Sequence, residues 1–171
     1  AREADVVGLS FVQNVADVDA LVAALDQLAG PRPRPAILLK IETAQAVRNL
    51  PDLIVAARAV GPAAVMIARG DLAVDVGFER LTELQDELLW ICEASHVPVV
   101  WATQVLDGLL HDGLATRAEA TDAAMGQRAE CVMLNKGPYQ REAVAFLRSV
   151  LTRMERHQAK KFARLAQLRS W

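Results

Sequence analysis

Apolar and polar positions along the chain alternate between two periods. Short runs rich in Val, Ile and Leu predict strands that are buried on both faces, and the segments after them repeat apolar residues at helical spacing. The expected strands cover residues 5–12, 36–42, 64–68, 98–102 and 131–134, and helical patterns start at 17, cover 45–60 and 79–95, extend to about 127, and resume from 141. This alternation predicts an α/β fold with a parallel sheet wrapped by helices.

The end of the chain differs in charge. Residues 153–171 carry six basic side chains against a single acid, Glu155. We therefore expect a barrel-like part over residues 1–152 and a basic helical tail over 153–171. Basic residues at a helix end suit the helix dipole, so a solvated helix end is favoured over a docking or nucleic-acid role.

Composition narrows the class of protein. The 171 residues are 53% hydrophobic, enough for the core of one domain, and a net charge of −2 gives no overall field that recruits nucleic acid or an anionic membrane. Cys92 and Cys131 lie in apolar stretches and are expected to be reduced, buried thiols. Neither a signal sequence nor a membrane-spanning run is recognisable, so we expect a cytoplasmic protein.

Polar residues follow the predicted strands at the points where the strands end. They are Lys40 and Glu42, Arg69-Gly70-Asp71, Thr103-Gln104 and Asn135-Lys136. In parallel barrels the active site forms at the carboxyl ends of the strands and in the loops after them. The sequence therefore predicts one site to which several strands contribute.

Lys40 and Glu42 lie two residues apart on a strand, so both side chains point to the same face. One interpretation is a buried ion pair at the end of the sheet. The other joins Glu42 to Asp71 from the next strand, because two carboxylates suit one Mg²⁺ or Mn²⁺ and leave positions for substrate oxygens. Asp71 favours the metal site.

Two further positions suit a bound anion. Gly70 lets backbone N–H groups approach a carboxylate closely, with an ordinary turn as the alternative. Thr103 offers a hydroxyl, with a helix N-cap as the alternative. The stretch Thr116-Arg117-Ala118-Glu119 fits a capping box and is assigned a structural role.

These stretches resemble the signature stretches of pyruvate kinase in order and spacing. They are Lys40-Ile41-Glu42, residues 65–72 (VMIARGDL), residues 102–106 (ATQVL), residues 116–119 (TRAE) and residues 131–134 (CVML). The resemblance implies a partial TIM (β/α) barrel, made of roughly the last five βα units of an eight-stranded barrel. It also implies phosphate transfer between phosphoenolpyruvate and ADP, with Mg²⁺ or Mn²⁺ as cofactor.

The same resemblance implies a role for each site residue. Lys40 neutralises charge on the transferring phosphoryl group and on the enolate, and Glu42 and Asp71 hold the divalent metal. Gly70 and Asp71 present backbone N–H groups to the pyruvate carboxylate, and Thr103 presents its hydroxyl. Lys40 and Thr103 are thus the expected catalytic residues.

The chain also departs from the family pattern. The first three strands, the usual K⁺ ligands, the lid domain and the regulatory domain have no counterpart in it. Asn135-Lys136-Gly137-Pro138 stands where Ser-Gly-Glu-Thr-Ala is usual, and Gln13 stands in place of an arginine. We therefore expect weak or no activity from this chain alone, and either self-association or an amino-terminal part that supplies the missing strands.

Two other functions stay open at this point. Ile41-Glu42-Thr43-Ala44 with Asn49 also resembles the citrate-lyase-like family of Mg²⁺-dependent 2-keto-acid aldolases and lyases, which act through a pyruvate enolate and need no nucleotide. A non-catalytic module that binds a metabolite is the third interpretation. The kinase interpretation implies phosphoenolpyruvate or pyruvate, and ADP or ATP once the barrel is complete, as ligands.

Overall fold

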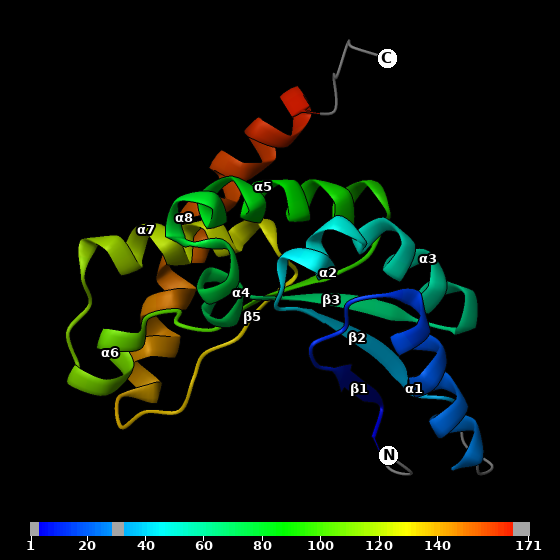
Figure 1. Cartoon of the computed structure of the whole chain (residues 1–171). Helices are drawn as coiled ribbons and strands as arrows, with labels where there is room; N and C mark the ends of the chain where they lie inside the picture. Colours follow the sequence, from blue (N-terminus) through cyan, green and yellow to red (C-terminus); the bar gives the residue numbers. More distant parts are fainter. Residues whose placement is uncertain (1–3, 29–32, 166–171) are drawn as a thin grey trace. The chain divides into compact units, whose positions relative to one another are not determined.

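The structure is a computed structural model that describes residues 4–28 and 33–165. In chain order its elements are β1 (Val6–Leu9), α1 (Val15–Gln27), β2 (Ala36–Ile41), α2 (Ala44–Arg48), α3 (Leu50–Val60), β3 (Ala63–Ala68), α4 (Arg69–Val76), α5 (Phe78–Ala94), β4 (Val99–Ala102), α6 (Asp107–Asp112), α7 (Arg117–Met125), the 3₁₀ helix η1 (Gly126–Arg128), β5 (Cys131–Val132) and α8 (Gln140–Leu165) (Figure 1). The chain divides into two compact units, residues 1–102 and 103–171.

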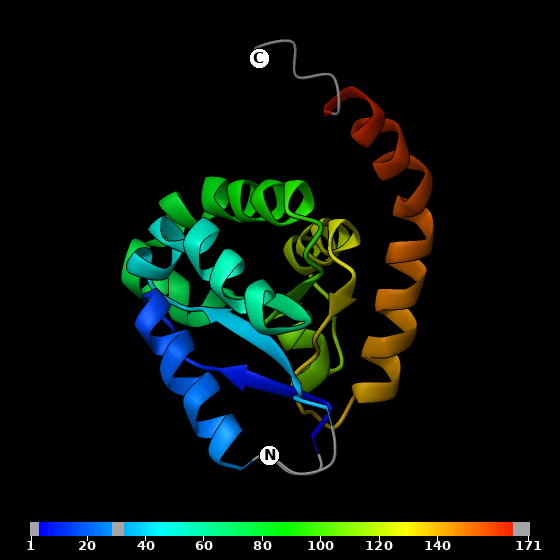
Figure 2. The same ribbon diagram turned by 90° about the vertical axis from the view of Figure 1, so that its right-hand side faces the viewer.

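The first unit is built on a parallel sheet in the order β1-β2-β3-β4. Along β2, every second residue is buried and the residues between are partly exposed, so one face of the sheet carries the core. Helices cover this face, with α1 and α3 side by side on it (Figure 2). The buried side chains include Leu39, Ile41, Leu53, Val65 and Ile67.

Two helices differ from their prediction. The helical pattern over 45–60 is interrupted at Asn49, where α2 ends and α3 begins. Pro51 lies in the first turn of α3, where its missing N–H costs nothing, whereas in the interior of one long helix it would remove a hydrogen bond. The turn expected as the alternative around Gly70 is the helix α4 instead.

The second unit consists of α6, α7, η1, β5 and α8, with α8 packed against α6, α7 and η1. The predicted capping box is confirmed: Glu119 N–H donates to Thr116 Oγ1 at 3.2 Å, and the Glu119 carboxylate accepts from Thr116 N–H at 2.9 Å. The division between 1–152 and 153–171 stays a prediction, since α8 runs through residue 152 without a break and residues 166–171 lie outside the described part.

The cysteine prediction holds in one case and is wrong in the other. Cys92 is buried in α5, but Cys131 is exposed. Cys131 begins β5, a strand of only two residues, which is too short to hold its first side chain inside a core. None of the helices in the described part is long and apolar enough to cross a membrane.

Candidate functional site

The strand register brings the predicted residues of the first unit to one edge of the sheet. Lys40 lies beside Met66, and Ile41 lies beside Ile67. Glu42 therefore leaves β2 at the level where β3 ends and α4 starts with Arg69. The carboxyl end of β2 and the first turn of α4, which holds Gly70 and Asp71, are neighbours on this edge, as the sequence predicts.

Glu42 is the most deeply buried acidic side chain at this edge, with 1% of its side chain exposed. Its Oε1 lies 2.8 Å from Lys40 Nζ, and its Oε2 accepts the N–H of Phe11 at 2.5 Å. Lys40 keeps 27% of its side chain exposed and also donates to Ser10 Oγ at 3.0 Å. The ion pair that was the alternative interpretation is present, and its lysine reaches solvent.

The segment after β1 contributes two groups that the sequence prediction did not include. Ser10 and Phe11 directly follow β1, and Phe11 has a φ of 51°, in the left-handed region that costs energy for a residue with a Cβ. In this conformation its N–H is directed at Glu42. Strain of this kind is concentrated at functional sites. Ser10 could have been recognised from the sequence as a polar residue at a strand end. The backbone N–H of Phe11 could not.

Gly70 and Asp71 occupy the second and third positions of α4, and Asp71 is exposed. First-turn N–H groups of a helix have no intrahelical acceptor, and the helix dipole makes this end attractive to anions. The other end of α4 is fixed to the strand-end region, because Asp75 Oδ2 accepts the N–H of Ala44, the first residue of α2, at 2.6 Å. The two segments that carry Glu42 and Asp71 are thus joined directly.

Thr103 begins the second unit, directly after β4. Thr103, Gln104 and Leu106 have φ values of 63°, 56° and 52°, so three residues with side chains adopt left-handed conformations here. Helix α6 begins only at Asp107, with Leu106 as its N-cap, so the alternative that Thr103 caps a helix is wrong. Its role beside Lys40 stays a prediction.

The donor chemistry of Glu42 and Asp71 fits a divalent cation. Hard cations such as Mg²⁺ prefer carboxylate oxygens and need only one or two from the protein. Each Glu42 oxygen has one protein partner, and a carboxylate offers about four lone-pair positions in all, so further acceptor capacity remains. Within residues 4–28 and 33–165, no three or more His, Cys, Asp or Glu side chains gather as a metal-binding group.

In the second unit, the loop after β5 is fixed to α6. Asn135 Nδ2 donates to Asp107 Oδ1 at 3.3 Å, and Tyr139 N–H donates to Leu110 O at 3.2 Å. Between them, Gly137 lies against the Leu110 backbone, so closely that a Cβ would be 2.3 Å from Leu110 O. The loop that departs from the family pattern therefore has a defined conformation that requires glycine.

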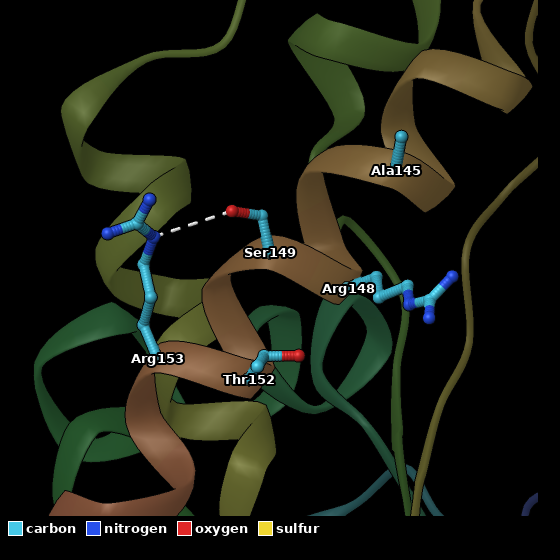
Figure 3. Close-up of a pocket in the computed structure, with 5 residues that line it drawn as sticks. All are labelled: Ala145, Arg148, Ser149, Thr152 and Arg153. Atoms are coloured by element: carbon cyan, nitrogen blue, oxygen red, sulfur yellow. Dashed lines mark hydrogen bonds between the residues drawn. The ribbon is translucent and has the colours of Figure 1, made fainter.

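A shallow hollow of about 540 Å³ lies beside α8 (Figure 3). Its lining residues are Ala145, Arg148, Ser149, Thr152 and Arg153. Arg153 Nε donates to Ser149 Oγ at 3.4 Å, and Arg148 points away from this pair (Figure 3). Because all of its lining comes from one helix and none from a strand end, it is not the predicted site.

The parallel sheet flanked by helices defines the class of protein, an α/β-barrel protein, and the candidate site lies at the carboxyl edge of this sheet. Residues 1–144 match the family model described as "Pyruvate kinase, barrel domain". The chain belongs to the pyruvate kinase family.

Individual relatives agree with the family match. The chain is 32% identical over 157 residues to "Pyruvate kinase" of Mycobacterium intracellulare, covering 88% of this chain and 32% of the relative. It is 31% identical over 165 residues to "Pyruvate kinase isozyme A, chloroplastic" of Ricinus communis, covering 91% and 27%. A crystal structure of a pyruvate kinase from Cryptosporidium parvum superposes with a TM-score of 0.78 at 31% identity, over 88% of this chain and 32% of that one.

These comparisons confirm the predicted family and fold class, a partial TIM barrel within an α/β fold. The chain spans between about a quarter and a third of the length of the relatives named here.

Proposed function

We propose that this chain supplies the phosphoenolpyruvate- and metal-binding edge of a pyruvate-kinase-type phosphotransferase, which transfers phosphate between phosphoenolpyruvate and ADP. The observation that carries the proposal is the buried carboxylate of Glu42, paired with Lys40 at 2.8 Å beside the first turn of α4. Phosphoryl transfer depends on positioning and charge neutralisation, and this edge offers a cation, two carboxylates and helix N–H groups for that purpose.

Lys40 is the residue we assign to charge neutralisation. Its ammonium has three donors, two of which are used by Glu42 and Ser10. The exposed part of the side chain leaves the third for an anionic oxygen of the substrate. In this role Lys40 stabilises negative charge on the phosphoryl group and on the enolate oxygen without leaving its two protein partners.

Glu42 and Asp71 are the residues we assign to Mg²⁺ or Mn²⁺. The ion, when bound, neutralises charge on the phosphoryl and enolate oxygens. Gly70 and Asp71 present the α4 N-terminus to the substrate carboxylate, with the Thr103 hydroxyl as a further donor. K⁺ belongs to the proposal only through a longer polypeptide, because its usual family ligands have no counterpart in this chain.

The aldolase or lyase interpretation loses support from the contacts of its own residues. Thr43 Oγ1 accepts the N–H of Ala46 at 3.1 Å and so caps α2. Asn49 Nδ2 donates to Gln13 O at 2.7 Å and so fixes the segment after β1. Both side chains have structural partners, and the family match favours the kinase.

The proposal is tested by calorimetric titration of the chain with Mn²⁺ and then with oxalate, a planar mimic of the pyruvate enolate. We expect oxalate to bind only after Mn²⁺. Glu42→Gln and Asp71→Asn should each weaken Mn²⁺ binding by at least about ten-fold, which is the loss of about 1.4 kcal/mol of interaction. Lys40→Met should keep Mn²⁺ and weaken oxalate.

Asp52→Asn is the matched control, since Asp52 is an exposed acid in the first turn of α3. Unchanged Mn²⁺ affinity in both carboxylate variants would refute the assigned site. Mn²⁺-dependent oxalate binding without phosphate transfer, in a polypeptide that completes the barrel, would favour the non-catalytic metabolite-binding module.

A further inference from the structure

Arg69 is a buried arginine at the start of α4, with only 6% of its surface exposed. Burying a guanidinium is costly unless charge or hydrogen-bond partners compensate for the lost water. Family membership alone does not explain why Arg69, next to the candidate site, is buried. The contacts of its side chain indicate its structural role.

Arg69 crosses from β3 to the neighbouring strand. Its Nε donates to Ala102 O, the last residue of β4, at 3.1 Å. Its guanidinium carbon lies 4.4 Å from the centroid of the Trp101 ring, within the range of a cation–π interaction. The register explains the reach, because Ala68 lies beside Ala102 and Arg69 is the next residue.

Trp101 is fully buried, and within the described part of the chain its Nε1 is a buried donor without a hydrogen-bond partner. A buried donor of this kind is unfavourable, so the indole is not held for its hydrogen bond. What it offers is a large aromatic face, and tryptophan provides the strongest one for a cation. The contact with Arg69 uses that face.

Helix α4 needs such an attachment because Ala68 precedes it, and an alanine N-cap has no polar side chain with which to fix the first turn. The last turn of α4 is held by the hydrogen bond between Asp75 and Ala44. The first turn, which carries Gly70 and Asp71, is held by Arg69.

We propose that Arg69 and Trp101 are positioning residues, which fix the first turn of α4 on the end of β4 and thereby place Gly70 and Asp71 beside the Lys40–Glu42 pair. The expected effect on ligand binding rests on the proposed function. The expected effect on the stability of α4 rests on the contacts of Arg69 alone. The two are measured separately.

The first measurement is amide hydrogen exchange in α4. Arg69→Met removes the hydrogen bond to Ala102 O and the contact with the Trp101 ring, and Trp101→Phe keeps a smaller aromatic face. We expect exchange of the α4 amides to become about ten-fold faster in Arg69→Met and to change less in Trp101→Phe, because the lost contacts stabilise α4 locally. Exchange of the α3 amides should not change. Arg58→Met, at an exposed arginine near the end of α3, is the control and should leave α4 unchanged.

The second measurement is oxalate affinity in the presence of Mn²⁺. We expect it to fall about ten-fold in Arg69→Met, and less in Trp101→Phe, while circular dichroism stays that of the unsubstituted chain. Unchanged α4 exchange in Arg69→Met overturns the positioning role, whatever oxalate does. Faster α4 exchange with no oxalate binding even by the unsubstituted chain confirms that Arg69 holds the helix and counts against the proposed function instead. Faster exchange with undiminished oxalate affinity overturns the link to the site.

Discussion

Replacing Glu119 by Gln should destabilise the second unit by about 2 kcal/mol at neutral pH. The carboxylate accepts from Thr116 N–H and Oγ1, both at 2.9 Å, and from Gly108 N–H at 2.6 Å. It thus joins the start of α7 to the start of α6. Hydrogen bonds to a charged acceptor contribute about 1.5–3 kcal/mol each, and because this site is partly exposed, we expect their combined loss to be only about 2 kcal/mol. Gln keeps one acceptor oxygen and turns an NH₂ group toward donors.

The effect should depend on pH in a defined direction. Burial of the carboxyl opposes ionisation and by itself would raise the pKa. The hydrogen bonds from Thr116 and from the first turn of α6 outweigh it and hold the pKa of Glu119 below its ordinary value of 4.5. A carboxyl whose pKa is lower in the folded state stabilises the fold above the unfolded-state pKa, and this stabilisation is lost as the pH falls through the folded-state pKa.

The assay is chemical denaturation of both proteins at pH 7 and at several values below 4.5. The difference in free energy of unfolding should be present at pH 7 and should shrink as the pH falls, because protonation of Glu119 imitates the amide. Glu87→Gln, at an exposed position in the middle of α5, is the control and should change little. Equal stability at pH 7, or a difference that is the same at low pH, would refute the reasoning.

Two further predictions concern backbone positions. Gly137→Ala should lower the free energy of unfolding by about 1–3 kcal/mol in thermal or denaturant melts, because its Cβ would lie 2.3 Å from Leu110 O and the loop must move. Lys136→Ala, at an exposed position, is the control and should not lower it. An equal loss in Lys136→Ala would contradict the clash. Phe11→Asn should raise the free energy of unfolding by about 0.5–1 kcal/mol, since Asn tolerates a φ of 51° and Phe11 is 58% exposed. A lower free energy of unfolding, or an equal gain in Phe11→Leu, would show that backbone strain is not the cause.

Strands were readable from the sequence because buried parallel strands are continuous apolar runs, and all five predicted runs contain a strand. The break within the helical pattern over 45–60 could not be recognised in the same way. Apolar spacing reports which face of a helix is buried and stays in phase across a short break, so it did not show that Asn49 separates α2 from α3. Around Gly70 the turn residue suggested a loop, whereas tertiary contacts of Arg69 and Asp75 accompany a helix there.

The candidate site was predictable from the sequence only where its groups are side chains at strand ends. The spacing of Lys40 and Glu42 placed them on one face, and the structure pairs them. The Phe11 N–H was not predictable, because a backbone donor has no signature in the sequence and its approach depends on the register of the neighbouring strand. The Arg69 contact with Trp101 depends on register in the same way.

The ion pair between Lys40 and Glu42 was considered as an alternative to a functional site, yet its geometry suits both roles. A carboxylate with 1% exposure needs compensating charge at all times, and Lys40 provides it. The lysine is not locked in this role, since it is partly exposed and has Ser10 as a second partner. A divalent cation that shares Glu42 would take over part of the compensation and allow Lys40 to turn its third donor toward an anionic substrate. Partial exposure also lowers the cost of desolvating the Lys40 ammonium, so one geometry serves both the compensation of Glu42 and the approach of an anion to Lys40.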